Sequence, residues 1–322
     1  MTATDDGSVG RRFTGVLTPI CTPLTDDGEV DVASLGSLIE FQLAAGAGGV
    51  FVLGSSGEAI YLDDGARRTV ALAARDAVGG RGHLVVGALA PTVDRVGQQL
   101  ELLADVGADA FVVTPPFYAV PSPREVLAHF RQIAAAAGSV PLFAYDIPGN
   151  VGYKLDPTLA VQLLGEGTVV ALKDSSGDLD AFARIAAGLG PDRRCGLLSG
   201  ADTTAVQALD LGADGLIAGL ANVRPDLFVR LMGAHRTGAQ DETASLQGTI
   251  TALHDLFSVG RRHGLGRHAS EIGGLKHVLR GLGVIGSART ARPLEPYPPA
   301  AAREAEALVA GLPGPQGPVP VP

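Results

Sequence analysis

The amino-acid sequence predicts an α/β protein whose strands and helices alternate and close into a (β/α)8 barrel, the TIM-barrel arrangement. Three observations support this. Eight strand-then-helix units follow one another from residue 12 to about residue 238. The strand candidates are apolar on successive residues, as strands buried on both faces are. The links between units are short, which favours parallel strands.

The alternative fold is an open doubly wound sheet, which usually has a glycine-rich phosphate loop after its first strand. Thr18-Pro19-Ile20 occupies that position instead.

The first strand candidate runs from Phe13 to Ile20 and ends at Thr22-Pro23. Asp31 is a suitable N-cap for the helix that follows, and Gly46 is a suitable stop. Between them, apolar residues recur at helical spacing: Leu35, Leu38, Ile39 and Leu43.

A segment that begins with glycine occurs three times, at 46–54, 107–113 and 212–218. Each copy has the pattern of a helix stop, a short link and a buried strand. The remaining strand candidates are 83–89, 140–145, 169–173 and 194–198. Helical patterns begin after the strands, near Asp63, Thr92, Ser122, Asp156, Asp178, Asp202 and Pro225.

Beyond the barrel (12–238), the chain changes to helices without strands. Residues 239–312 are predicted to form a three-helix appendage, with helices at 246–259, 272–282 and 300–312. The small, polar residues 1–11 are predicted to be a disordered lead-in, and the Pro/Gly-rich residues 313–322 an extended or disordered tail.

The composition limits the class of partner. A net charge of −9, with no basic cluster interleaved with aromatic residues, argues against a nucleic-acid partner. No apolar run approaches the roughly 20 residues that span a bilayer, so no membrane partner is expected. Cys21 and Cys195 lie in apolar surroundings, and the N-terminus lacks a basic region followed by an apolar core. We therefore expect buried free thiols and a cytoplasmic protein.

Active sites of such barrels lie at the carboxyl ends of the strands. One strand there ends in Lys173, after the apolar run 169–172, although only three of the 25 basic residues are lysines. Lysine, unlike arginine, can become a neutral nucleophile near neutral pH. The alternative interpretation is a strand-end cation paired with Asp174 or Asp178.

Other strand ends carry polar groups that suit chemistry by a lysine imine. The turn Gly54-Ser55-Ser56-Gly57-Glu58 offers two hydroxyls and backbone N–H groups that can hold a carboxylate, or it is a plain turn before a helix-start glutamate. Tyr145 precedes Ile147-Pro148 and either reacts or packs at a strand end. Thr114 to Tyr118 and Ser199-Gly200 follow two further strands. No His/Cys/carboxylate cluster has metal-ligand spacing, so we expect no metal.

In combination, these motifs resemble the dihydrodipicolinate synthase / N-acetylneuraminate lyase family of pyruvate-dependent class I aldolases over residues 13–298. The motifs that carry the resemblance are 54–58, Tyr145-Asp-Ile-Pro148, Leu172-Lys-Asp-Ser-Ser-Gly-Asp178 and Ser199-Gly200. The resemblance implies a covalent lysine imine with the substrate and no separate cofactor. It also implies a homotetramer built as a dimer of dimers.

The resemblance further implies a role for individual residues. Lys173 would form the Schiff base with a 2-oxo acid, and Tyr145 would move protons beside it. Ser55 would join the proton relay, while Ser56 would bind the substrate carboxylate together with Gly57. Gly200 would leave room for the reacting carbon. Tyr118 most nearly matches a tyrosine that reaches the neighbouring subunit's site, with Phe117 as the alternative because the extra proline of Pro115-Pro116 blurs the alignment.

The choice of reaction rests on the residues after Tyr-x-x-Pro. Synthases of this family usually carry an arginine there for the carboxylate of aspartate semialdehyde, whereas this chain has Gly149-Asn150. We therefore expect cleavage of a 2-keto-3-deoxy sugar acid, or a related 4-hydroxy-2-oxo acid, to pyruvate and an aldehyde. Asn150 would bind a substrate hydroxyl, or it is a turn residue. The alternatives are 4-hydroxy-tetrahydrodipicolinate synthase, an imine-dependent dehydratase and an inactive 2-oxo-acid sensor.

The appendage also contains several polar residues. His254, His263 and His268 occur among Arg261, Arg262 and Arg267, and we interpret this stretch as a solvated or interface loop. Lys154 and Lys276 are predicted to be structural, with Lys276 contacting the barrel from the appendage.

Overall fold

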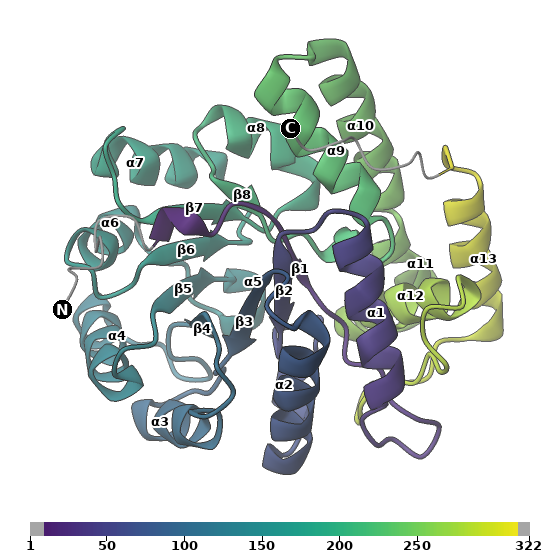
Figure 1. The fold of residues 1–322 in the computed structure, drawn as a ribbon, viewed down its shortest axis with the longest axis horizontal. Helices are drawn as coiled ribbons and strands as arrows, with labels where there is room; N and C mark the ends of the chain where they lie inside the picture. The colour runs from purple at the N-terminus through teal and green to yellow at the C-terminus, as the bar shows by residue number, and fades with distance from the viewer. Residues whose placement is uncertain (1–9, 315–322) are drawn as a thin grey trace.

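The computed structural model describes residues 10–314 of the chain. Its eight parallel strands pair in chain order, and β8 pairs with β1, so the predicted barrel is closed (Figure 1). The strands are β1 (Gly15–Pro19), β2 (Gly49–Val52), β3 (His83–Gly87), β4 (Ala110–Val113), β5 (Leu142–Asp146), β6 (Ala171–Asp174), β7 (Gly196–Ser199) and β8 (Gly215–Leu216).

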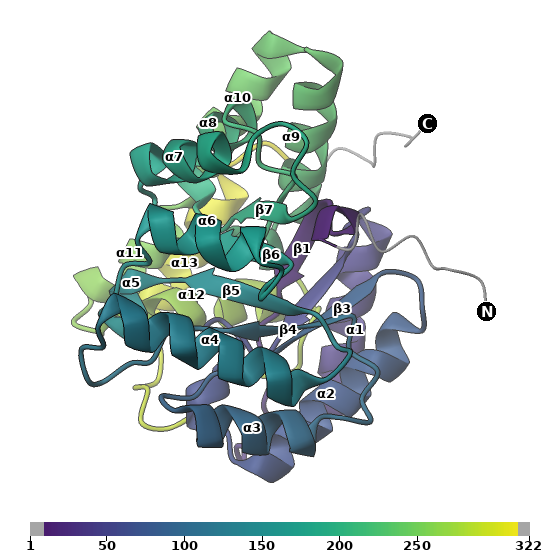
Figure 2. The same ribbon diagram turned by 90° about the vertical axis from the view of Figure 1, so that its left-hand side faces the viewer.

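Helices cover the outside of the barrel and separate the strands along the chain (Figures 1 and 2). They are α1 (Val32–Ala44), α2 (Asp64–Val78), α3 (Val93–Leu102), α4 (Pro123–Ala137), α5 (Pro148–Val151), α6 (Pro157–Gly165), α7 (Leu179–Leu189), α8 (Ala205–Asp210) and α9 (Pro225–Thr237). Short 3-10 helices occur at η1 (Gly10–Arg12), η2 (Ala59–Tyr61), η3 (Asp202–Thr204) and η4 (Gly219–Asn222).

The predicted helix starts are confirmed by capping hydrogen bonds. Six side chains each accept a hydrogen bond from a backbone N–H in the first turn of the helix that they precede, which satisfies a donor that has no partner within the helix. They are Asp31, Asp63, Thr92, Ser122, Asp156 and Asp178.

The N-terminal side of the barrel is closed by residues that the sequence assigned in part to a disordered lead-in. Gly10 is buried in η1, and a Cβ there would lie 2.0 Å from the carbonyl oxygen of Val170. The lead-in prediction is therefore wrong for residues 10 and 11, because η1 packs against the start of β7. The other lead-in residues, 1–9, and tail residues 315–322 lie outside the described part of the chain.

Four helices, not the predicted three, follow α9 in the described residues: α10 (Gln240–Leu253), α11 (Leu256–Arg262), α12 (Arg267–Gly281) and α13 (Pro299–Ala310). The single helix predicted at 246–259 is divided because α10 packs on α9 while α11 packs on α12, so the chain changes direction between them. The helices α11, α12 and α13 pack on one another, as Figures 1 and 2 show. Between residues 10 and 314, no helix combines the length and apolar character needed to cross a membrane.

Cys21 and Cys195 are buried free thiols, as predicted. Burial raises the pKa of the Cys21 thiol to about 12, so this thiol stays protonated at neutral pH. Neither cysteine lines the cavity described below.

Candidate active site

A cavity of about 280 Å³ opens at the carboxyl ends of the barrel strands. It brings together most of the residues predicted from the sequence: Ser55, Ser56, Tyr145, Asn150, Lys173 and Gly200. Ligand pockets usually range from roughly 300 to 1,000 Å³. The cavity therefore suits a small substrate.

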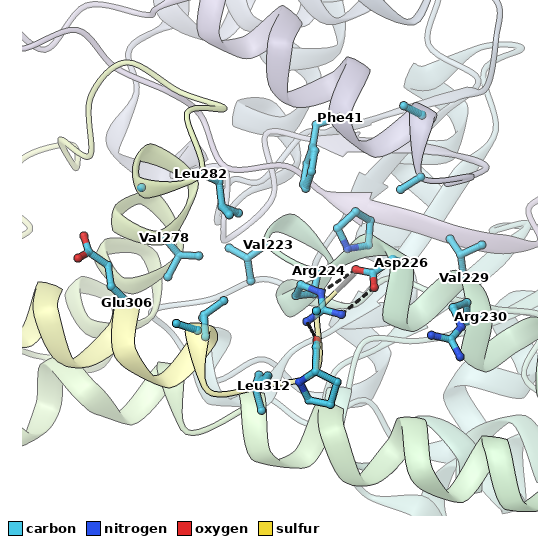
Figure 3. A pocket seen from close by; sticks show the side chains of 18 residues that line it. Phe41, Val223, Arg224, Asp226, Val229, Arg230, Val278, Leu282, Glu306 and Leu312 are labelled. Carbon is cyan, nitrogen blue, oxygen red and sulfur yellow. Dashed lines mark hydrogen bonds and ion pairs between the residues drawn. The ribbon is translucent and has the colours of Figure 1, made fainter. Parts of the chain in front are cut away.

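A second cavity, of about 760 Å³, lies between α1, α9, α12 and α13 (Figure 3). None of the predicted site residues lines it. Its buried arginine, Arg224, is already paired, with Nη2 at 2.7 Å from Oδ2 of Asp226. The polar groups that could perform covalent chemistry are therefore in the smaller cavity.

Lys173 projects into the smaller cavity from β6. Its Cα is in register with that of Tyr145 on β5, and its Nζ lies 4.0 Å from the centroid of the Tyr145 ring. The centroid of Phe51 is 4.8 Å away on another side. The lysine is only 3% exposed. An amine held between two aromatic rings in a nearly dry site can approach a carbonyl without first displacing a hydration shell.

The alternative interpretation of Lys173, as a cation paired with Asp174 or Asp178, is wrong. Asp178 caps α7 by accepting a hydrogen bond from the backbone N–H of Ala181. Asp174 projects away from the barrel interior and lies 4.0 Å from Nζ of Lys154. Lys154 also pairs with buried Asp146, so it has the structural role that the sequence predicted. Within residues 10–314, Lys173 has no carboxylate within ion-pair distance.

Ser55 and Ser56 lie on the tight turn after β2. The turn contains Glu58 in the left-handed region, at φ +58°, and the backbone N–H of Glu58 donates to the carbonyl of Ser55. The side-chain amide of Asn150 donates to Oγ of Ser55 over 3.3 Å. The two hydroxyls therefore face the cavity on a turn connected to the loop after β5.

The turn is fixed from outside the barrel by α12. Nζ of Lys276 pairs with Oε2 of Glu58, and both side chains have no exposed surface. The backbone N–H of Ala291 donates to Oε1 of Glu58 over 2.6 Å, and Nζ of Lys276 donates to the carbonyl of Arg289 over 2.7 Å. Lys276 therefore contacts the barrel from the C-terminal helices, as the sequence predicted.

The two predicted glycines, Gly200 and Gly57, differ in their position relative to the cavity. At Gly200, a Cβ would lie 2.1 Å from Oγ of Ser175 and 3.1 Å from Cε of Lys173, so a side chain would displace Ser175 and crowd the lysine. Gly57 does not line the cavity. It packs behind the turn, where a Cβ would lie 3.1 Å from the carbonyl oxygen of Ile20.

Tyr118 does not reach the cavity within its own chain. Its side chain is fully exposed, and its backbone has a φ of +77°, which is uncommon for a residue other than glycine. Phe117, the alternative, lines a cavity of about 70 Å³ that shares Ser55 and Asn150 with the site.

Several cavity residues were not identified from the sequence. Arg267 and His268 were interpreted as part of a solvated or interface loop, but they form the first turn of α12 and line the cavity. His254, at the end of α10, lines it too. Of the three histidines, His263 agrees with the solvated interpretation, since it pairs at the surface with Glu304. A possible signal was the helical spacing of Ala269, Ile272, Leu275 and Leu279, which extends the predicted helix back to a start after Gly266.

Asp202, in the turn after β7, is a further unassigned member of the site. It lines the cavity with a buried carboxyl. Burial raises its pKa to about 7, against the lowering effects of a hydrogen bond from the backbone N–H of Leu220 and of the positive charge of Lys173. Near neutral pH this carboxyl can therefore donate or accept a hydrogen bond to a substrate hydroxyl.

We expect Asp202→Asn to change how stability depends on pH. A carboxyl whose pKa rises from 3.8 to about 7 on folding binds more protons in the folded state, so wild-type stability falls as pH increases through this interval. Between pH 5 and 8 the asparagine variant should gain about 2–3 kcal/mol relative to wild type. Urea unfolding of both proteins at pH 5, 6, 7 and 8 measures this, and parallel profiles would contradict it.

The described residues contain no group of three or more His, Cys, Asp or Glu side chains that could hold a metal ion. The polar groups of the cavity include the Lys173 amine, the Tyr145 phenol, serine hydroxyls, the carboxyls of Asp202 and Glu271, and the side chains of Asn150, His254, Arg267 and His268.

Comparison with known proteins agrees with the fold. The model of the dihydrodipicolinate synthetase family matches residues 12–311. An uncharacterized DapA-like lyase of Halobacterium salinarum is 31% identical over 273 residues, which cover 83% of this chain and 88% of the relative. The 4-hydroxy-tetrahydrodipicolinate synthase 1 of Streptomyces coelicolor is 33% identical over 257 residues, covering 79% of this chain and 80% of the relative.

A solved structure resembles the whole barrel with its C-terminal helices. The prophage protein YagE of E. coli K12, of the dihydrodipicolinic acid synthase family and in complex with pyruvate, superposes with a TM-score of 0.85 at 25% identity. The match covers 92% of this chain and 98% of YagE.

Proposed function

Since the chain belongs to the dihydrodipicolinate synthetase family of pyruvate-dependent lyases and synthases, we propose that it is an aldolase acting on a 2-keto-3-deoxy sugar acid or a related 4-hydroxy-2-oxo acid. The products are pyruvate and an aldehyde. The observation that carries this proposal is the position of Lys173, which is buried in a cavity with Tyr145, Ser55 and Ser56 and has no carboxylate partner among the described residues.

The reaction begins with attack of the neutral Lys173 amine on the 2-oxo carbon, and loss of water gives an iminium ion. The iminium accepts the electron pair of the C3–C4 bond when that bond breaks, so the pyruvyl fragment becomes an enamine. Tyr145, which gave its proton to the departing water when the iminium formed, takes up the proton of the 4-hydroxyl, and an aldehyde leaves. Protonation of the enamine at C3, followed by hydrolysis of the imine, releases pyruvate and restores the amine.

The hydroxyls provide the remaining contacts. Ser56 and backbone N–H groups of the turn after β2 bind the substrate carboxylate, and Ser55 exchanges protons with Tyr145. Asn150 lines the cavity beside Ser55, to which its amide donates, and would contact a substrate hydroxyl there. Gly200 leaves space for the reacting carbon beside Lys173.

The test is reduction with borohydride in the presence of pyruvate, followed by peptide mass spectrometry. We expect a stable pyruvyl adduct on Lys173. A panel of 2-keto-3-deoxy acids and 4-hydroxy-2-oxo acids, assayed for pyruvate release, then identifies the substrate. An adduct on another residue, or no adduct, would contradict the proposal.

Tyr145→Phe removes the phenol that moves the proton and leaves the aromatic ring beside Lys173. We expect kcat for pyruvate release to fall by about 10²- to 10⁴-fold, the usual contribution of a general acid–base group. The pyruvyl adduct on Lys173 should still form, because the amine is intact. Unchanged turnover would assign the proton transfer to another group.

A second candidate is 4-hydroxy-tetrahydrodipicolinate synthase, the name borne by the Streptomyces relative. Pyruvate and aspartate semialdehyde form one arm of the same panel and discriminate between the two reactions. An imine-dependent dehydratase would instead release water and no pyruvate. A sensor would bind pyruvate and release nothing.

The assembly proposed for this chain is a homotetramer in which Tyr118 contacts a second copy. Tyr118 and Val120 are both exposed in the loop between β4 and α4, where a second copy would cover them. Small-angle scattering measures the assembly. A fully active monomer would contradict the role of Tyr118.

A further inference from the structure

The cavity is lined by one arginine, which comes from the C-terminal helices rather than from a barrel strand. Arg267 is the first residue of α12 and lies against α5, the short helix after β5. Its Nη2 donates to the carbonyl of Gly149 over 2.9 Å and to Oδ1 of Asn150. The guanidinium group is therefore fixed against Asn150, whose amide also contacts Ser55.

Gly149 provides the space for this guanidinium. A Cβ at position 149 would lie 2.7 Å from Nη1 of Arg267, closer than real Cβ contacts. The absence of a side chain after Tyr145-Asp-Ile-Pro148 and the presence of Arg267 are thus linked, although the two residues are far apart in the sequence. The sequence predicted no cation beside this motif, and α12 supplies one.

The guanidinium has unused hydrogen-bonding capacity. Among residues 10–314, its hydrogen bonds all come from Nη2, which leaves Nε and Nη1 for a ligand. The carboxylate that approaches it, that of Glu271, has Oε1 at 4.0 Å from Nε, beyond hydrogen-bond distance. The side chain is 43% exposed. Both edges through which a guanidinium can bind a carboxylate with two parallel hydrogen bonds include Nη2, which is already engaged here. A ligand carboxylate would therefore accept a single charge-assisted hydrogen bond from Nη1 or Nε.

His268 contacts the guanidinium of Arg267 at this edge of the cavity and is neutral at neutral pH. Its Nε2 lies 3.3 Å from Nη2 of Arg267, and its Nδ1 lies 3.1 Å from the hydroxyl of Tyr61. Burial and the adjacent Arg267 charge lower the pKa of His268, so Arg267 carries the positive charge here at neutral pH.

We propose that Arg267 is a specificity-determining residue that binds a carboxylate at the end of the substrate remote from the 2-oxo group. This proposal rests on the proposed function, because the 2-oxo carbon must be at Lys173 for the remainder of the substrate to extend toward Arg267. One guanidinium, with the carboxyl groups of Glu271 and Asp202 in the same cavity, suits one negative charge better than the two of a phosphate. The substrate class is thereby narrowed to 2-oxo acids with a second carboxylate.

The experiment compares ligands that differ only in the terminal group. 2-Oxoglutarate and 2-oxoadipate carry a second carboxylate, whereas 2-oxopentanoate and 2-oxohexanoate have the same chain lengths without it. Dissociation constants are measured by calorimetry for wild type, Arg267→Gln and Arg280→Gln. Arg280 is exposed at the last turn of the same helix, so its variant matches the change in charge.

We expect wild type and Arg280→Gln to bind at least one dicarboxylate roughly 10- to 100-fold more tightly than its monocarboxylate counterpart, and Arg267→Gln to lose this preference. Gly149→Ala should reduce the preference in the same direction, because its Cβ displaces the guanidinium. Equal weakening of both ligand classes by Arg267→Gln would assign it a structural role and overturn the proposal. So would the absence of a preference in wild type, or tighter binding of a 2-oxo acid with a terminal phosphate ester.

The proposed function is judged by a separate readout. Borohydride reduction with pyruvate should label Lys173 equally in wild type and Arg267→Gln, since pyruvate has no second carboxylate. Failure of this labelling in wild type would contradict the lysine imine. If wild type shows the labelling but no preference for dicarboxylates, only the role of Arg267 is contradicted.

Discussion

Lys173→Arg is expected to abolish pyruvate release and the borohydride-trapped adduct together. Arginine keeps the positive charge near the rings of Tyr145 and Phe51, but it cannot become the neutral nucleophile that forms an imine. Removal of the covalent route should lower turnover by more than about 10³-fold. Pyruvate release and peptide mass spectrometry measure the two losses.

Lys154→Arg is the matched control for this substitution. Lys154 pairs with Asp146 outside the barrel interior, and an arginine preserves that charge. The control should retain turnover and the adduct on Lys173. If Lys173→Arg keeps measurable turnover while the control loses it, the nucleophile has been assigned to the wrong lysine.

Lys276→Met is expected to have the largest effect on stability. The substitution leaves the carboxylate of Glu58 without its cation in a site with no exposed surface. Removal of one partner of a buried ion pair costs about 3–5 kcal/mol. Urea titration at fixed protein concentration measures the free energy of unfolding. Turnover should fall as well, because Glu58 orients the turn that carries Ser55 and Ser56.

The double variant Glu58→Gln with Lys276→Met tests whether the unpaired charge of Glu58 causes the loss of stability in Lys276→Met. It removes both charges and keeps a side-chain oxygen for the backbone N–H of Ala291. It should be more stable than Lys276→Met alone, because the uncompensated charge is gone. If the double variant is the less stable of the two, the loss arises from packing and not from the charge.

The barrel could be predicted from the sequence because its signals are local. Each unit has an apolar strand of a few residues, and six of the helices that follow begin at a capping side chain such as Asp63 or Ser122, close by in the chain. The C-terminal helices were predicted less well. The division between α10 and α11 depends on which helix each one packs against, and the residues around His254 do not specify that.

The residues of the candidate site also fall into a group that the sequence predicts and a group that it does not. Lys173, Tyr145, Ser55 and Ser56 were found because each directly follows or ends a strand, and parallel strands bring their carboxyl ends together. Arg267 and His268 were missed because α12 reaches the cavity only through tertiary packing. The buried Asp202 was visible after β7, but its shifted pKa depends on burial that the sequence does not reveal.

The pair between Glu58 and Lys276 also affects how this protein can be divided and recombined. The sequence suggests a boundary near residue 239, where an engineer would join this barrel to the C-terminal helices of a relative. The ion pair crosses that boundary with no exposed surface, and Arg267 crosses it at the cavity. A chimera joined there should inherit both the fold and the substrate preference only if its donor supplies a matching cation at each of the two positions.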